Sequence, residues 1–257
     1  MLKQRVITAM VGIPVVVAVS YWGGIVFHLA ITLVQLVGLH EFFNFATPPV
    51  RSKYVRVIFS IALFAYSVFS VGHEAQLKLF FFTLLLIPFL FGVEDWGGLT
   101  SAFWGIAYVG LLSFLVALRE LPQGFEMVMW VFGTMWANDT AAYFIGKKWG
   151  HRKLVPKISP NKSWAGALAG CAVGVAVAML LNYFFQLFQL GQMLLAAFIV
   201  VIAGQWGDII ESAIKRNAGV KDSGRILPGH GGVLDRFDGL IIASPAIYWY
   251  VSWLIRS

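Results

Sequence analysis

The sequence predicts an all-α, polytopic integral membrane protein, and its composition and its long apolar runs support this fold class. Of the 257 residues, 59% are hydrophobic and only 12% are charged, against about 25% charged residues in soluble globular domains. The mean hydropathy is +0.79. Long apolar runs recur along the chain, many near the roughly 20 residues that a helix needs to cross a bilayer. The alternating segments of an outer-membrane barrel are absent from the sequence.

Hydropathy predicts about nine transmembrane helices, with Gly, Pro and charged residues marking the breaks. The first imitates a signal peptide, but its apolar part is long, lacks a clear cleavage site and is followed by further spans, so we interpret it as a retained helix. The fourth is the weakest because it is short. The predicted spans are 6–22, 25–45, 55–72, 77–93, 102–119, 127–146, 165–187, 193–214 and 239–255.

The basic residues predict how these spans are oriented. With a cytoplasmic N-terminus, 16 of the 19 Lys and Arg residues lie on the cytoplasmic side, and only Lys78, Arg119 and Arg256 lie outside. Because cytoplasmic loops carry an excess of Lys and Arg, this distribution supports both the orientation and the nine spans. The net charge of +7 then reflects topology and contact with anionic membrane lipids, and we expect no nucleic-acid partner.

We expect two regions along the chain. Residues 1–126 form an N-terminal membrane-spanning region of about five helices, and residues 127–257 form a membrane region with the candidate functional residues. The second region carries two polar cytoplasmic loops, 147–164 and 215–238, which a charged ligand from the cytosol would meet. The single cysteine, Cys171, lies in an apolar run, so we expect neither a disulfide framework nor a cysteine-based metal site.

The segment GQWGDIIESAIKR (204–216), which leads into the second loop, places polar side chains on one helical face. Asp208, Glu211, Ser212 and Lys215 are spaced i, i+3, i+4 and i+7, within an arc of about 100°. Carboxylates inside a span are costly and usually face a cavity, a partner or an ion. The structural alternative is an intramembrane ion pair of Asp208 or Glu211 with Lys215, and the spacing leaves both open.

The stretch KDSGRILPGHGGVLDRFDG (221–239) concentrates charge and glycine in an otherwise apolar chain. Carboxylates without cysteine suit hard ions such as Mg²⁺. Basic side chains and glycines suit phosphate, because glycines let backbone N–H groups approach an anion closely. A solvated charged loop is the alternative, and the Walker A pattern is missing. The residues concerned are Asp222, Asp235, Asp238, Lys221, Arg225, Arg236, His230, Gly229, Gly231 and Gly232.

The first polar loop offers a second candidate set. Asp139 lies near the cytoplasmic end of the sixth span, next to Asn138, and Lys162 and Ser163 precede the seventh span. Ser163 is a plausible cap for that helix, whose N-terminus would favour an anion. Capping together with anchoring by basic residues is the structural alternative.

His40 and Glu41 are adjacent inside the second span. For these two residues we favour structural pairing between helices, with a polar cavity facing Glu41 as the alternative.

Two segments resemble a known family. The chain carries SAIKRNAGVKDSGRILPGHGGVLDRFD at 212–238 and SPNKSWAG at 159–166. The first resembles the signature of the phosphatidate cytidylyltransferase (CDP-diacylglycerol synthase) family with its spacing intact. The second is similar to a Ser-Pro-x-Lys-Ser/Thr element of that family, although Ala165 stands where many relatives carry glutamate. The resemblance is strong over 147–240, whereas the N-terminal spans agree only in character.

The resemblance implies a reaction and a metal. CTP and phosphatidic acid would give CDP-diacylglycerol and pyrophosphate, with Mg²⁺ held by Asp208 and Asp235 and a monovalent cation such as K⁺ beside it. We expect Asp139, Asp222 and Asp238 as further ligands or close to the metal. The lipid phosphate, with a second pKa of about 6, needs no strong base, so positioning and charge neutralisation carry the catalysis.

The basic residues, glycines and serines complete the expected site. Those assigned to the triphosphate and the leaving pyrophosphate are Lys215, Arg216, Lys221 and Arg236; those assigned to an anion-binding nest are His230, Gly229, Gly231 and Gly232; those assigned to the lipid phosphate or CTP are Lys162, Ser163 and Ser212.

Two other functions are weighed against this one. The nearer is a related CTP-dependent membrane enzyme acting on another lipid phosphate or alcohol. The other is an ion-coupled transporter using Asp139, Asp208 and Glu211, which is disfavoured because no inverted repeat is visible and the charges crowd one membrane face. We expect the inner (plasma) membrane of a bacterium, a site on the cytoplasmic face, and, from the resemblance, a homodimer.

Overall fold

The computed structural model describes residues 2–69, 96–226 and 231–256. It is 80% helical, and in its described part five segments are long and apolar enough to cross a membrane: Gly24–Phe45, Gly97–Glu120, Trp164–Phe185, Leu190–Asn217 and Leu234–Arg256. The predicted helical membrane fold is therefore confirmed. The number of nine spans and the cytoplasmic N-terminus stay predictions, and the predicted span 77–93 lies outside the described residues.

The chain divides into two compact units. Unit 1 comprises Met1–Ala117 and Asn217–Arg236, and unit 2 comprises Leu118–Arg216 and Phe237–Ser257. This division groups residues by packing. The predicted division at residue 126 separated a variable region from a functional one, and it stays a prediction.

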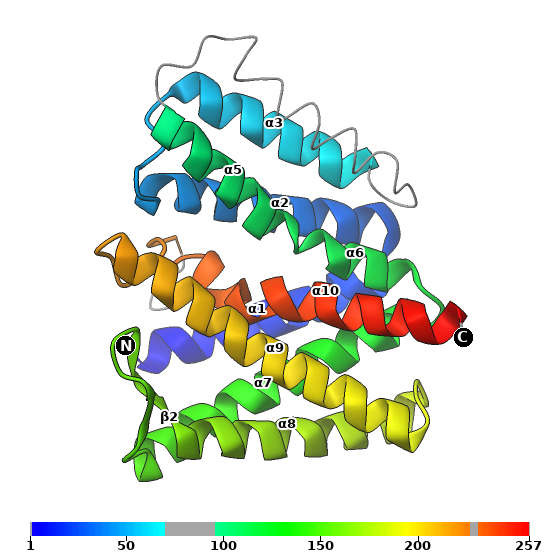
Figure 1. The fold of residues 1–257 in the computed structure, drawn as a ribbon. Helices are drawn as coiled ribbons and strands as arrows, with labels where there is room; N and C mark the ends of the chain where they lie inside the picture. The colour runs from blue at the N-terminus through cyan, green and yellow to red at the C-terminus, as the bar shows by residue number, and fades with distance from the viewer. Residues whose placement is uncertain (1, 70–95, 227–230, 257) are drawn as a thin grey trace. The chain divides into compact units, whose positions relative to one another are not determined.

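Unit 1 is built around three helices that lie side by side, α2, α3 and α5 (Figure 1). Leu39, Phe43, Phe59 and Leu63 are fully buried between them, as expected for the apolar faces of packed helices. The helices that begin within the first segment of this unit, Met1–Ala117, are α1 (Leu2–Trp22), α2 (Gly24–Phe45), α3 (Lys53–Phe69), α5 (Trp96–Gly110) and α6 (Ser113–Glu120). The predicted span 102–119 is thus interrupted by a short turn, where the Ser113 hydroxyl donates to the Gly110 carbonyl at 2.7 Å.

Unit 2 is organised by the pair α7 and α8, which lie side by side (Figure 1). Every fourth residue on the buried face of α8 is small, namely Gly166, Gly170, Gly174 and Ala178. Such residues let two helix backbones approach closely; a Cβ atom on Gly170 would lie 2.7 Å from Asn138 Oδ1. The elements are α7 (Gly124–Trp149), β1 (Lys153–Val155), β2 (Ser159–Ser163), α8 (Trp164–Phe185), α9 (Leu190–Asn217) and α10 (Leu234–Arg256).

The two predicted polar loops are more regular than expected. Inside 147–164, β1 and β2 form an antiparallel hairpin with Lys153 opposite Ser163 and Val155 opposite Ser159. In the second loop the flanking helices extend into the polar sequence, so α9 ends only at Asn217 and α10 already begins at Leu234. The physical reason is electrostatic, because basic residues stabilise a helix C-terminus and acidic residues its N-terminus, and these lie in the last turn of α9 and the first turn of α10.

Candidate functional site

Chain direction brings the polar residues of unit 2 to one end of its helices. The hairpin joins the end of α7 to the start of α8, and α9 returns toward the hairpin, where Arg216 Nε donates to the Ile158 carbonyl at 3.2 Å. The predicted cap of α8 is confirmed, because Ser163 Oγ accepts from the Gly166 N–H at 3.2 Å. The hairpin therefore holds Lys162 beside the polar end of α9.

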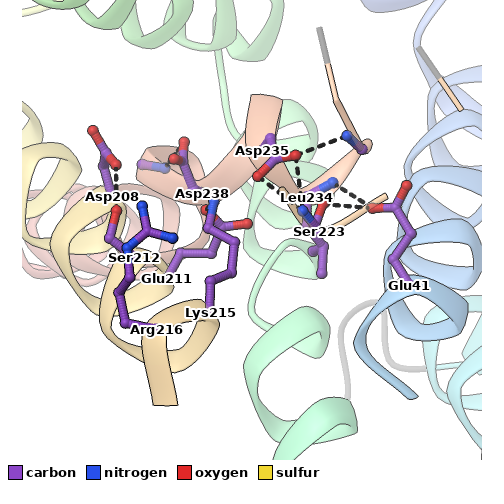
Figure 2. A network of polar contacts seen from close by, with 12 residues as sticks. Glu41, Asp208, Glu211, Ser212, Lys215, Arg216, Ser223, Leu234, Asp235 and Asp238 are labelled. Carbon is purple, nitrogen blue, oxygen red and sulfur yellow. Dashed lines mark hydrogen bonds and ion pairs between the residues drawn. The ribbon is translucent and has the colours of Figure 1, made fainter. Parts of the chain in front are cut away.

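Asp208 on α9 is the point where the hairpin and that helix meet. Lys162 Nζ lies 2.6 Å from Asp208 Oδ2. The Ser212 hydroxyl donates to Asp208 Oδ1 at 3.4 Å (Figure 2). The side chains of Lys162 and Asp208 are 22% and 44% exposed, so a solute can still reach the carboxylate. A residue predicted to bind metal and one predicted to bind phosphate are thus paired with each other.

The same face of α9 also carries a buried ion pair. Lys215 donates to Glu211 Oε2, and the two side chains are only 8% and 0% exposed. The structural alternative weighed for Lys215 is therefore confirmed for its pairing with Glu211. Arg216, one residue later, is exposed and better able to meet a soluble anion.

Asp238 is surrounded by like charge. Its carboxylate is repelled by those of Asp208, Glu211 and Asp139. Small residues at the α9–α10 contact allow this approach, since a Cβ atom on Gly207 would lie 2.5 Å from the Asp238 carbonyl oxygen.

A chain of amide side chains holds Asp139 on the α7 side of this cluster. Asn138 Nδ2 donates to Asp139 Oδ1 at 2.9 Å, and Gln205 Nε2 donates to Asn138 Oδ1, also at 2.9 Å. Asn138 is 1% exposed, so its orientation, and through it that of Asp139, is fixed by the helix contact.

The donor chemistry of unit 2 suits a hard divalent cation. The carboxylates of Asp208, Glu211 and Asp139 repel that of Asp238, and a bound cation would relieve that repulsion. In the ranges that the structure describes, however, no three His, Cys, Asp or Glu side chains already converge on a point where a metal ion could sit. Binding would therefore require side chains to turn.

In unit 1, Asp235 fastens the two ends of the glycine-rich loop together. Its Oδ2 accepts from the Gly232 N–H at 2.7 Å and from the Ser223 N–H at 3.0 Å (Figure 2). Gly231 has φ +82°, a conformation that favours glycine, and a Cβ atom there would strike the Asp235 carboxylate. Ser223 and Gly232 thus both donate to the side chain that was predicted to bind metal.

Glu41 on α2 holds the same loop from the other side. The side chain is 2% exposed. Its Oε1 accepts from the Val233 N–H at 2.9 Å, and its Oε2 accepts from the Leu234 N–H and the Ser223 hydroxyl, both at 3.0 Å (Figure 2). The first N–H groups of a helix lack intrahelical partners, so Glu41 caps α10. The structural role favoured for Glu41 is confirmed, whereas His40 is exposed.

The remaining predicted residues fall into two groups. Lys221, Asp222 and Arg236 are exposed in unit 1, open to a soluble ligand. Gly229 and His230 lie outside the described residues. The pair predicted to share a metal ion is divided between the units, Asp235 in unit 1 and Asp208 in unit 2, and their sharing stays a prediction from the sequence.

Sequence reasoning missed Ser223 and Gln205, and it gave Glu41 no role toward the loop. Ser223 is 6% exposed and donates to the carboxylates of both Asp235 and Glu41. A polar side chain next to glycine in a charged segment was a usable signal for Ser223, and an amide inside an apolar span was one for Gln205. No local signal links Glu41 to a loop 182 residues away.

Comparison with known proteins places the chain in a family. The profile of the cytidylyltransferase family matches residues 3–254. Among similar proteins, the phosphatidate cytidylyltransferase of Staphylococcus haemolyticus is 34% identical over 96% of this chain and 97% of its own length. That of Haemophilus influenzae is 30% identical over 99% of this chain and 100% of its own. That of Bacillus subtilis is 36% identical over 73% and 72%. By these matches, the chain belongs to the cytidylyltransferase family.

Proposed function

We propose that this protein transfers the cytidylyl group of CTP to phosphatidic acid, giving CDP-diacylglycerol and pyrophosphate. The observation that carries the proposal is similarity along nearly the full length to proteins named phosphatidate cytidylyltransferase, 34% identical in one case and 30% in another. The membrane helices fit a substrate whose acyl chains stay in the bilayer, and the polar helix ends fit one that comes from water.

The transfer of the cytidylyl group requires that the two substrates be positioned for in-line attack and that the charge of their phosphates be neutralised. An oxygen of the lipid phosphate attacks the α-phosphorus of CTP in line, the bond to the bridging oxygen breaks, and pyrophosphate leaves with that electron pair. The exposed bases Arg216, Lys221 and Arg236 support binding of the triphosphate and the leaving group. Lys215 is buried against Glu211, so its contribution is to hold α9 in shape.

Lys162 is suited to a phosphate contact on different grounds. It lies on the hairpin next to the capped start of α8, and a helix N-terminus favours an anion. When Lys162 binds a phosphate oxygen, its pairing with Asp208 is released, and that carboxylate becomes available to a cation. Substrate binding and metal binding would then support each other.

The carboxylates proposed to hold Mg²⁺ are Asp208 and Asp235, with Asp139 and Asp238 close by. Bound there, the ion would neutralise charge on the phosphates as the P–O bond breaks. The monovalent cation and the homodimer expected from the resemblance are part of the same proposal. So is the location in the inner membrane of a bacterium with the site on the cytoplasmic face, which the excess of basic residues in the polar loops supports.

The proposal is tested with purified protein in liposomes containing phosphatidic acid, with labelled CTP and Mg²⁺. We expect labelled CDP-diacylglycerol in the lipid phase and pyrophosphate in the water phase, in equal amounts. Parallel liposomes with another lipid phosphate or a long-chain alcohol test the related enzymes. Product only from those lipids, or from none, would overturn the assignment.

A further inference from the structure

We infer that Glu41, on a helix outside the signature segments, is a positioning residue for Asp235. The inference rests on the proposed function for its effect on turnover. The contact on which it depends, between Glu41 on α2 and residues 223–224 and 232–234, can be tested without any substrate. All residues involved belong to unit 1.

The first step is the burial of the charge. A carboxylate that is 2% exposed persists only when its oxygens are well hydrogen-bonded. Glu41 meets this condition with three donors, at 2.9, 3.0 and 3.0 Å, all from the segment that carries Asp235. Two of these donors are N–H groups at the start of α10 that have no partner within the helix. A negative charge at this position is also favoured by the helix dipole.

The second step is the space that the glycines leave. A Cβ atom on Gly224 would lie 2.5 Å from Glu41 Oε1, and one on Gly232 would lie 2.5 Å from Glu41 Oε2. The lack of a side chain at both glycines therefore makes room for the Glu41 carboxylate. This role of the glycines is separate from any binding of an external anion by the loop.

The third step links Glu41 to Asp235 through shared partners. Ser223 gives its hydroxyl to Glu41 and its backbone N–H to Asp235. The next two backbone N–H groups also donate to these two carboxylates: that of Gly232 donates to Asp235, and that of Val233 donates to Glu41. If Glu41 releases the loop, both fixed donors of Asp235 lose their support, and the direction of its carboxylate is no longer set.

The substitution Glu41→Gln tests this step with little change of volume. The amide keeps one acceptor, and its NH₂ group must face an N–H of Val233 or Leu234 as a second donor. We expect those two amides to exchange hydrogen about tenfold faster or more in the substrate-free protein. We also expect kcat to fall about 10- to 100-fold, as for other residues that orient a catalytic carboxylate, with KM for phosphatidic acid changed less than about twofold.

The matched control is Gln35→Leu. Gln35 is a fully buried polar residue on the same helix, but it donates to the carbonyls of Val109 and Gly110 rather than to the loop. This variant should lower thermal stability without accelerating exchange at Val233 and Leu234, and its kcat should stay close to the wild-type value.

A second variant keeps the proposal testable if Glu41→Gln folds poorly. Ser223→Ala removes only the hydroxyl link, and its loss of kcat should be smaller; the double variant should lose less than the product of the two single losses. Unchanged exchange at Val233 and Leu234 in Glu41→Gln, or an equal loss of kcat in Gln35→Leu, would overturn the positioning role. A wild-type protein without cytidylyltransferase activity would instead refute the proposed function. The hydrogen-exchange rates of Val233 and Leu234 would then still test whether Glu41 holds this segment.

Discussion

Removing one member of the buried Lys215–Glu211 pair should damage the protein more than removing both. The two side chains are 8% and 0% exposed, so a single substitution leaves a buried charge that has lost this ion-pair partner. Breaking such a pair costs about 3–5 kcal/mol, whereas replacing both partners with apolar residues is often neutral. Lys215→Met should be the more harmful single change, because Glu211 then faces the repulsion of Asp238 without compensation.

The measurement is a double-mutant cycle on the free energy of unfolding in detergent, with Lys215→Met, Glu211→Leu and the double variant. We expect each single variant to lose about 3 kcal/mol or more, and the double variant to return to within about 1 kcal/mol of wild type. Single losses below about 1 kcal/mol, the range of solvent-exposed pairs, would refute the reasoning. Turnover of a stable double variant would further show that Lys215 acts through the fold rather than on the triphosphate.

Three further outcomes are expected. Gly170→Ala should lower the free energy of unfolding by about 1–3 kcal/mol through overpacking, because its Cβ atom meets Asn138 at 2.7 Å, whereas Gly191→Ala, with nothing within 4 Å, should be neutral in the same thermal melts. Lys162→Met should change stability by less than about 1 kcal/mol yet lower kcat/KM for CTP or phosphatidic acid at least tenfold; normal kinetics would remove it from the phosphate site. Asp235→Asn should abolish product formation in the liposome assay with thermal stability nearly retained, and near-normal turnover would exclude Asp235 from the metal site.

The membrane fold could be predicted because a bilayer admits few structures for apolar runs of this length. The ends of the helices could not, since hydropathy marks where apolar sequence stops and not where hydrogen bonding stops. Lys215 and Asp235 were therefore placed in a loop, although both lie in helical turns. The hairpin was missed for a related reason, because its short strands carry proline and basic residues that are typical of loops.

The candidate site was predicted where its parts are close in sequence. Helical spacing gave the shared face of Asp208, Glu211 and Lys215, and with it the ion pair as an alternative. The pairing of Lys162 with Asp208, and the hold of Glu41 on the loop, join segments far apart in the chain. Such contacts depend on tertiary packing, for which one sequence carries no local signal.

The long-range cap on α10 has a consequence for biogenesis. Glu41 enters the membrane with α2, but its partners Val233 and Leu234 are 192 and 193 residues further along the chain. At a synthesis rate of about 5–20 residues per second, the ribosome needs roughly 10–40 seconds to deliver them. During that interval the nascent protein carries an ionisable side chain in α2 whose binding partners do not yet exist. Chains that end before residue 233 would keep Glu41 without these two donors.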